Sequence, residues 1–186
     1  MVSLRSLVAG AALFAPVLAA ATAQQIADSL ASLTRKFQDL QNPAQRISLV
    51  NAPLIIIGQG PFPQIIAGLN DITSTGKALT DQFDGTPNLE GAEGDLVFNA
   101  FRGFVRVQQA FLNILIGKAG ILEKVPLVGD PVANSLRGVE GVDDTISINL
   151  INLLISKTQD AQDEANALSE SIDLCISKYE GLATGL

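Results

Sequence analysis

Residues 96–122, LVFNAFRGFVRVQQAFLNILIGKAGIL, decide the fold. Successive residues of a helix lie about 100° apart, so this stretch places its polar side chains in a single strip. The strip holds Asn99, Arg102, Arg106, Gln109 and Asn113. The apolar side chains cover an arc of roughly 200°, which is wider than the ~100° stripe of an ordinary surface helix. They are Phe101, Phe104, Val105, Val107, Phe111, Leu112, Ile114 and Leu115. The pattern predicts one long helix with more apolar surface than a single packing contact requires.

One polar residue, Gln108, interrupts the apolar arc near its middle. A buried amide that finds no hydrogen-bond partner costs about 1–3 kcal/mol. Two interpretations follow. In the first, the helix is central and packed on two sides, and Gln108 bonds to the backbone of a neighbour. In the second, the helix lines an apolar cavity, and Gln108 contacts a ligand there.

Composition excludes several classes of function. The chain of 186 residues has no histidine and one cysteine, which removes Ser-His-Asp and Cys-His nucleophiles, histidine metal sites and intrachain disulfides. Twelve basic against 19 acidic residues give a net charge of −7, which disfavours nucleic acid as a partner. We therefore expect neither an enzyme nor a protein with a cofactor or a metal.

The N-terminal segment, residues 1–23, has the pattern of a signal peptide. Arg5 provides a positive start, residues 7–18 are apolar, and Ala21-Thr22-Ala23 is a small-residue cleavage site. The apolar run is too short to span a membrane, and residues 96–122 contain three basic side chains. We expect a secreted chain with one domain over residues 24–186 and no transmembrane segment.

Helical periodicity extends over most of that domain. A heptad-like stripe predicts a first helix over residues 24–41, and Asn42-Pro43 predicts the start of a second, which would run to about residue 57. A third helix follows over residues 62–83. Residues 84–94 are rich in glycine and acidic side chains, which is typical of a loop.

Two further helices follow residue 122. Asp130-Pro131 predicts an N-cap and first position, and Ser156-Lys157-Thr158-Gln159 predicts the start of a last helix that Gly181 would end. The fold class is therefore all-α: a single-domain bundle of five to six mostly antiparallel helices joined by short turns.

The remaining candidate groups have ordinary structural interpretations. Cys175 lies on the apolar stripe of the last helix, so we expect a buried thiol. The pair Asp143-Asp144 and the group Asp160, Asp163 and Glu164 are best interpreted as solvated helix faces.

A second stretch, residues 142–155, also carries apolar residues around much of a helix. Two such helices in a small bundle carry apolar surface that must be shielded from water. The two helices could shield each other, or a lipid, a partner protein or an external hydrophobic surface could do so. For an internal ligand, we expect Gln108 as the polar contact and apolar walls from three helices. The wall residues are Phe101, Phe104, Phe111, Leu115, Ile65, Leu69, Ile72, Ile146, Leu150 and Leu153.

The stretch from Phe104 to Gly120, with Val125-Pro126-Leu127 and residues 136–143 (LRGVEGVD), resembles fungal secreted proteins of the hydrophobic surface-binding protein A type. The resemblance covers about residues 40–180. It implies a secreted helical bundle that adsorbs to hydrophobic surfaces. Related cell-wall galactomannoproteins hold fatty acids between their helices. Those proteins often carry Ser/Thr-rich tails or anchors, whereas this sequence ends soon after its last predicted helix, so we expect an extracellular or loosely wall-associated protein.

Three hypotheses follow. The bundle binds a fatty acid or other apolar ligand inside, or it presents apolar helices to an external hydrophobic surface, with a secreted hydrolase as a candidate partner. Alternatively, it is a structural or interaction protein whose apolar arc forms an oligomer or partner interface.

Overall fold

Five α-helices form the part of the chain that the computed structural model describes, residues 20–51, 54, 57–122 and 128–183. A short 3-10 turn, η2 (Ile155–Lys157), separates the last two. The helices are α1 (Ala23–Gln45), α2 (Pro61–Thr80), α3 (Gly91–Leu122), α4 (Gly129–Leu153) and α5 (Thr158–Ala183). The all-α fold class is confirmed.

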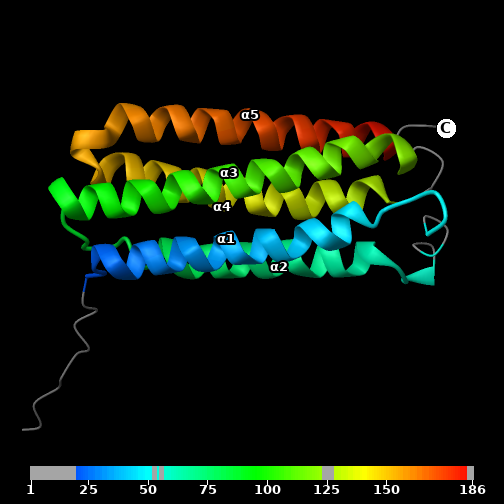
Figure 1. Cartoon of the computed structure of the whole chain (residues 1–186), viewed down its shortest axis with the longest axis horizontal. Coiled ribbons are helices and arrows are strands. Elements are labelled where there is room, and N and C mark those ends of the chain that lie inside the picture. Colours follow the sequence, from blue (N-terminus) through cyan, green and yellow to red (C-terminus); the bar gives the residue numbers. More distant parts are fainter. Residues whose placement is uncertain (1–19, 52–53, 55–56, 123–127, 184–186) are drawn as a thin grey trace, which may run out of the picture.

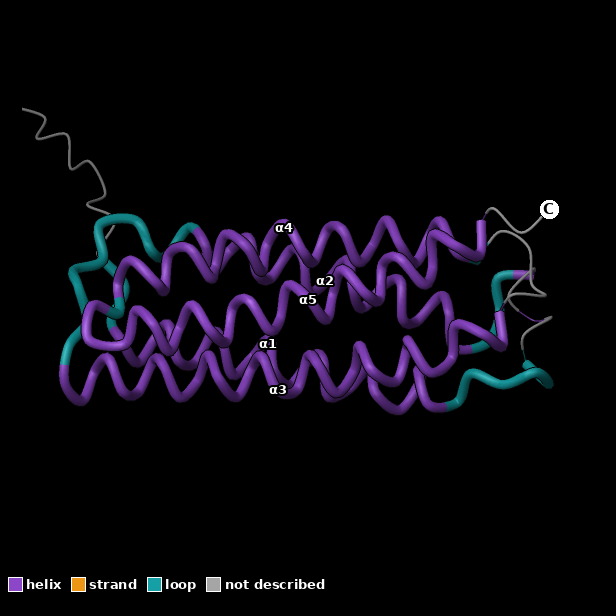
Figure 2. The backbone as a smooth tube through the Cα atoms, turned by 90° about the horizontal axis from the view of Figure 1, so that it is seen from above, coloured by secondary structure: helices purple, strands orange, loops and turns teal. Residues whose placement is uncertain are grey.

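The helices stand in a closed ring. Around it, α1 packs on α2, α2 on α4, α4 on α5, α5 on α3, and α3 on α1 (Figures 1 and 2). Consecutive helices run antiparallel, as expected, although the connection from α1 to α2 is longer than a short turn and spans residues 46–60. In the ring, however, α3 runs parallel to both of its neighbours, α1 and α5, and α2 runs parallel to α4. The interior of the ring is thus enclosed by all five helices.

The first helix is longer than its stripe predicts. α1 continues through Pro43 to Gln45, and the predicted new helix at Asn42-Pro43 does not begin there. The physical reason is packing, because Pro43 and Ala44 are buried and extend the apolar stripe from Leu40 to Ile47. At its other end, Thr22 and Gln25 form a capping box. Residues 52–53 and 55–56 of the predicted second helix lie outside the described residues.

The long helix α3 starts at Gly91, five residues before the predicted start, so part of the expected loop is helical. Its first turn carries Glu93, whose charge suits a helix N-terminus. α4 also differs at its start, because Val128 takes the N-cap position and Asp130 lies in the first turn. The predicted break before the last helix occurs at Leu154, followed by η2.

Two glycines of α2 let its neighbours approach closely. A Cβ at Gly68 would lie 2.5 Å from a δ-methyl of Leu40 in α1, and one at Gly76 would overlap a γ-methyl of Val142 in α4. The ring therefore closes tightly on both sides of α2.

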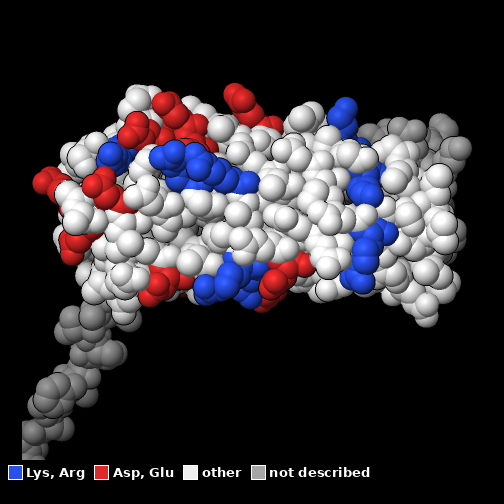
Figure 3. All heavy atoms as spheres, in the orientation of Figure 1, with Lys and Arg blue, Asp and Glu red and all other residues white. Residues whose placement is uncertain are grey.

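The surface of the bundle is uneven in charge. In Figure 3, acidic side chains gather over the end where the chain enters α1, whereas the opposite end of this face shows basic and uncharged side chains. In the described part of the chain, no helix is apolar and long enough to cross a membrane.

Candidate functional site in the interior of the ring

All eleven residues predicted to surround a ligand lie inside the ring. They come from one face of α2, one of α3 and one of α4, and each is buried. The ten apolar residues among them all belong to one larger core cluster. They are Phe101, Phe104, Phe111, Leu115, Ile65, Leu69, Ile72, Ile146, Leu150 and Leu153. The spacing of residues therefore predicted which faces of α2, α3 and α4 are buried. Whether those residues bind a ligand stays a prediction.

The space opposite Phe104 and Phe111 is occupied by Phe37 of α1. Its ring centroid lies 5.9 Å from that of Phe104 and 5.7 Å from that of Phe111. Phe101 stacks on Phe104 at 6.4 Å. These four rings form the aromatic centre of the core, and an apolar chain could reach Phe104 only if Phe37 moved. The predicted first helix, residues 24–41, includes Phe37, but no sequence pattern indicates that this side chain faces Phe104.

A buried polar pair crosses the ring. The Nε2 atom of Gln108 in α3 donates a hydrogen bond to Oδ2 of Asp143 in α4, although these two helices are not neighbours in the ring. Gln108 is 0% exposed and Asp143 is 5% exposed. The other amide atom of Gln108, Oε1, is the one buried side-chain polar atom in the described part of the chain without a partner. Gln108 thus bonds to a side chain, whereas a backbone partner had been one of the two expectations.

The expectation that Asp143 lies on a solvated face is wrong, while Asp144 beside it is exposed. Asp143 is four residues after Val139 and three before Ile146, so it shares their interior stripe. That spacing was the available signal. The partner, Gln108, could not be inferred from it because it is far away in the sequence.

The protonation of Asp143 follows from this position. Burial raises the pKa of its carboxyl well above the ordinary value, the hydrogen bond from Gln108 lowers it, and the negative charges of Asp144 and Glu140 raise it further. Burial dominates because it removes water from the charged form. The uncharged carboxylic acid is therefore favoured inside the ring.

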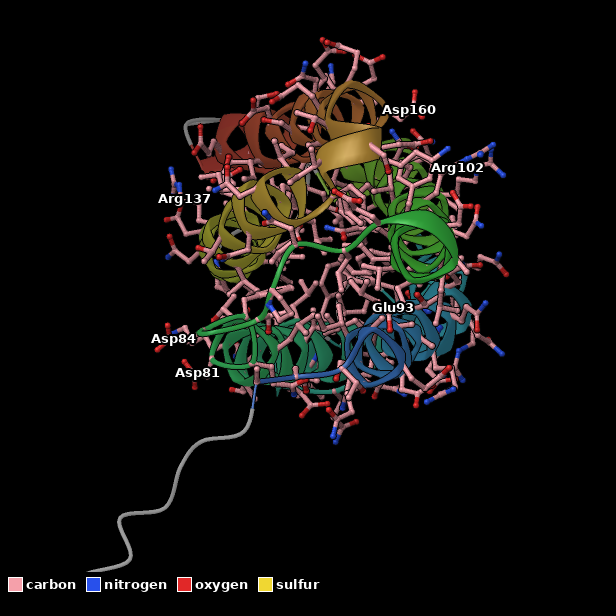
Figure 4. All side chains as sticks on the ribbon, turned by 90° about the vertical axis from the view of Figure 1, so that its left-hand side faces the viewer. Asp81, Asp84, Glu93, Arg102, Arg137 and Asp160 are labelled. Carbon is pink, nitrogen blue, oxygen red and sulfur yellow. The ribbon has the colours of Figure 1, made fainter. Side chains whose placement is uncertain are left out.

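Basic side chains lie at the outside of the bundle. Figure 4, seen along the helices, shows Arg102 and Arg137 at the rim. Arg102 pairs with Glu164 of α5 at 3.3 Å, and Arg137 pairs with Glu180. Within the described ranges, the buried polar side chains are those of Gln108, Ser135, Asp143 and Ser147, none of which is basic. The fully buried side chains of these ranges thus include no cation for a bound anion.

Two further buried side chains on α5, Cys175 and Tyr179, each carry a group that could ionise. Cys175 is buried and free, as expected, and burial raises the pKa of its thiol to about 12. The hydroxyl of Tyr179 donates to the carbonyl oxygen of Leu115 at 3.0 Å, which ties α5 to α3. Neither group is prepared for chemistry at neutral pH, since a thiol must ionise to act as a nucleophile.

One apolar hollow opens between α2 and the start of α4. It has a volume of about 480 Å³ and is lined mostly by apolar side chains, which the sequence did not single out. The lining residues are Gly58, Phe62, Pro63, Ile66, Ala67, Asn70, Val128 and Pro131. Phe62 belongs to the core and lies one turn before Ile65, one of the predicted walls, so the hollow adjoins the core. A larger hollow of about 690 Å³ between the start of α1 and the end of α2 is lined largely by polar and acidic residues.

Exposed aliphatic side chains follow the end of α1. Leu49 is 68% exposed, Val50 89% and Ile57 65%, and Leu54 lies between them. We call these four residues the aliphatic connection. The chain is held near it by Lys118, whose Nζ donates to the carbonyl oxygen of Ile47 at 2.9 Å.

No family model matches the sequence, and no curated protein matches it either. The resemblance to hydrophobic surface-binding protein A therefore rests on the motif alone and stays a prediction.

Solved structures do share the fold. Afmp4p in complex with palmitic acid has a TM-score of 0.68 and 18% identity, covering 87% of this chain and 99% of its own. Ligand-binding domain 1 of the Penicillium marneffei MP1 protein, complexed with arachidonic acids, has a TM-score of 0.70 and 14% identity, covering 82% and 94%. Domain 2 of that protein, in complex with arachidonic acids, has a TM-score of 0.70 and 15% identity, covering 86% and 92%. Across nearly its whole described length, the chain has the fold of domains that have been solved with fatty acids bound.

Proposed function

We propose that the protein binds long-chain apolar molecules inside the ring and does no chemistry on them. The observation that carries the proposal is a ring of five helices with a continuous apolar interior, in a fold that Afmp4p and the MP1 domains share while holding fatty acids. Burial of an alkyl chain provides about 25 cal/mol per Å² of apolar surface, which would drive binding.

Access to the interior requires rearrangement, because Phe37 fills the space opposite Phe104 and Phe111. The apolar hollow between α2 and α4 is the proposed starting point, since it adjoins the helix face that carries Ile65. In this proposal, the incoming chain takes the place of packed side chains.

The test uses residues 24–186 after removal of lipid, with binding of a fluorescent fatty acid followed by titration. Wild-type protein is expected to bind. Leu150→Phe adds volume to the interior face of α4 and is expected to weaken binding by about tenfold, equivalent to about 1.4 kcal/mol. Ile148→Phe is the matched control on the same helix, since Ile148 is 60% exposed. Circular dichroism of both variants checks that the fold is retained. A delipidated wild-type protein that binds no apolar probe would refute the proposal.

A second candidate function, adsorption to hydrophobic surfaces, is supported by the aliphatic connection. The test measures retention on octyl-coated beads. The double variant Leu49→Ser with Val50→Ser is expected to lose retention, and Leu174→Ser, an exposed leucine on α5, is the control. Retention should survive moderate salt because the force is not ionic. Equal retention of both variants would exclude this surface.

Secretion and a loose association with the cell wall complete the proposal. They rest on the signal-like residues 1–23 and on the resemblance described above. Expression of the full chain, followed by mass measurement of the protein in the medium, tests cleavage within this segment. Co-purification of a secreted hydrolase from surface-adsorbed protein tests whether such an enzyme is a partner.

A further inference from the structure

The interior of the ring contains one polar position that its own side chains leave incomplete. Gln108 Oε1 is a carbonyl oxygen on a residue that is 0% exposed, and it has no partner in the described part of the chain. An unsatisfied buried acceptor costs about 1–3 kcal/mol. A ligand that brings a hydrogen-bond donor to this point would recover that cost.

Asp143, the second side chain of the pair, determines which further hydrogen-bonding group the ligand needs. When Asp143 is protonated, its carboxyl group has one O–H donor in addition to its acceptor capacity. Burial and the charges of Asp144 and Glu140 raise the pKa of Asp143, which favours this protonated form. The position therefore presents one acceptor, on Gln108, beside one donor, on Asp143.

The surrounding charges disfavour an anion. Asp144 and Glu140 on α4 act on Asp143 and are both negative, and α3 presents the neutral Gln108. On α3 and α4 themselves, Arg102 and Arg137 form their ion pairs at the outside of the bundle, with Glu164 and Glu180. A carboxylate headgroup would meet no buried basic side chain of the described residues and would bring no donor for Oε1.

We propose that the Gln108–Asp143 pair selects apolar ligands with an uncharged hydroxyl headgroup, such as a long-chain alcohol, over fatty-acid carboxylates. The ligand hydroxyl donates to Gln108 Oε1 and accepts from the carboxyl group of Asp143. This inference rests on the proposed function, because it concerns the headgroup of a ligand held inside the ring.

The test compares 1-hexadecanol, palmitate and hexadecane at neutral pH with delipidated protein, by displacement of an uncharged fluorescent probe. Wild-type protein is expected to bind 1-hexadecanol at least about tenfold more tightly than palmitate, which corresponds to about 1.4 kcal/mol. Asp143→Asn keeps the size of the side chain and cannot ionise beside a bound carboxylate, so it should strengthen palmitate binding relative to the alcohol. Gln108→Leu should abolish the preference for 1-hexadecanol over hexadecane.

Asp144→Asn makes the same chemical change one residue away at an exposed position, and it should leave the ratio of affinities unchanged. The inference is overturned if wild-type protein binds palmitate as tightly as 1-hexadecanol and Asp143→Asn leaves that ratio as it was; the proposed function then still stands. If none of the three probes binds, the proposed function fails, and this inference fails with it.

Discussion

Replacing Asp143 by asparagine should change how the stability of the protein depends on pH. In the folded state burial raises the pKa of Asp143, whereas in the unfolded chain the carboxyl has an ordinary pKa of about 3.9. Between these two values the folded protein binds the extra proton. The stabilisation is therefore complete below the unfolded pKa and is lost as the pH rises through the folded pKa.

The magnitude follows from linkage. Each pH unit between the two pKa values lowers the free energy of unfolding of wild-type protein by up to about 1.4 kcal/mol through this group alone. Asparagine does not titrate, and its carbonyl oxygen can still accept the hydrogen bond from Gln108 Nε2. Asp143→Asn should therefore resemble wild type at pH 4 and become the more stable protein towards pH 7.

Urea denaturation at pH 4, 5, 6 and 7 measures this. The difference between variant and wild type isolates Asp143, because the other acidic residues titrate in both proteins. Asp144→Asn at the exposed neighbouring position should change stability by no more than about 0.5 kcal/mol at any pH. Parallel pH profiles for wild type and Asp143→Asn would refute the assignment of Asp143 as a buried acid.

Three further predictions concern the packing of the ring. Phe37→Ala should lower the free energy of unfolding by about 3–5 kcal/mol, measured by urea denaturation, because the side chain is fully buried. Gly76→Ala should lower the melting temperature and cost about 1–3 kcal/mol, since the new Cβ overlaps Val142. Tyr179→Phe should cost about 1 kcal/mol in urea denaturation through loss of the hydrogen bond to Leu115.

Matched substitutions on the same bundle separate these effects from general damage. Leu174→Ala removes an exposed side chain and should change stability by less than about 0.5 kcal/mol. Gly103→Ala places its Cβ in open space within α3 and should stabilise by up to about 1 kcal/mol. A Phe37→Ala protein as stable as Leu174→Ala, a Gly76→Ala protein as stable as Gly103→Ala, or an unchanged Tyr179→Phe would contradict the packing described above.

Periodicity predicted much of the fold because each helix buries one face. The residues chosen for the interior from α2, α3 and α4 are all buried, since a 3.6-residue repeat fixes which side chains share a face. Capping motifs in the sequence predicted helix ends less well where side-chain packing favoured a different end. Asn42-Pro43 has the form of a helix start, yet burial of Pro43 keeps it inside α1.

The candidate site was harder to predict because its decisive contacts join distant parts of the chain. Phe37 meets Phe104 and Phe111 only because α1 and α3 are neighbours in the ring, an order that no single helix encodes. The sequence pattern groups Asp143 with Asp144 on a solvated face, because its partner Gln108 lies on another helix.

The central claim, that an apolar chain binds inside the ring, is tested most directly by nuclear Overhauser effects between a 13C-labelled long-chain alcohol and the delipidated protein. We predict contacts from the alkyl chain to Phe104, Leu69 and Leu150, with the hydroxyl end near Gln108. Contacts confined to Leu49 and its neighbours in the aliphatic connection, with none to the buried core, would contradict the account.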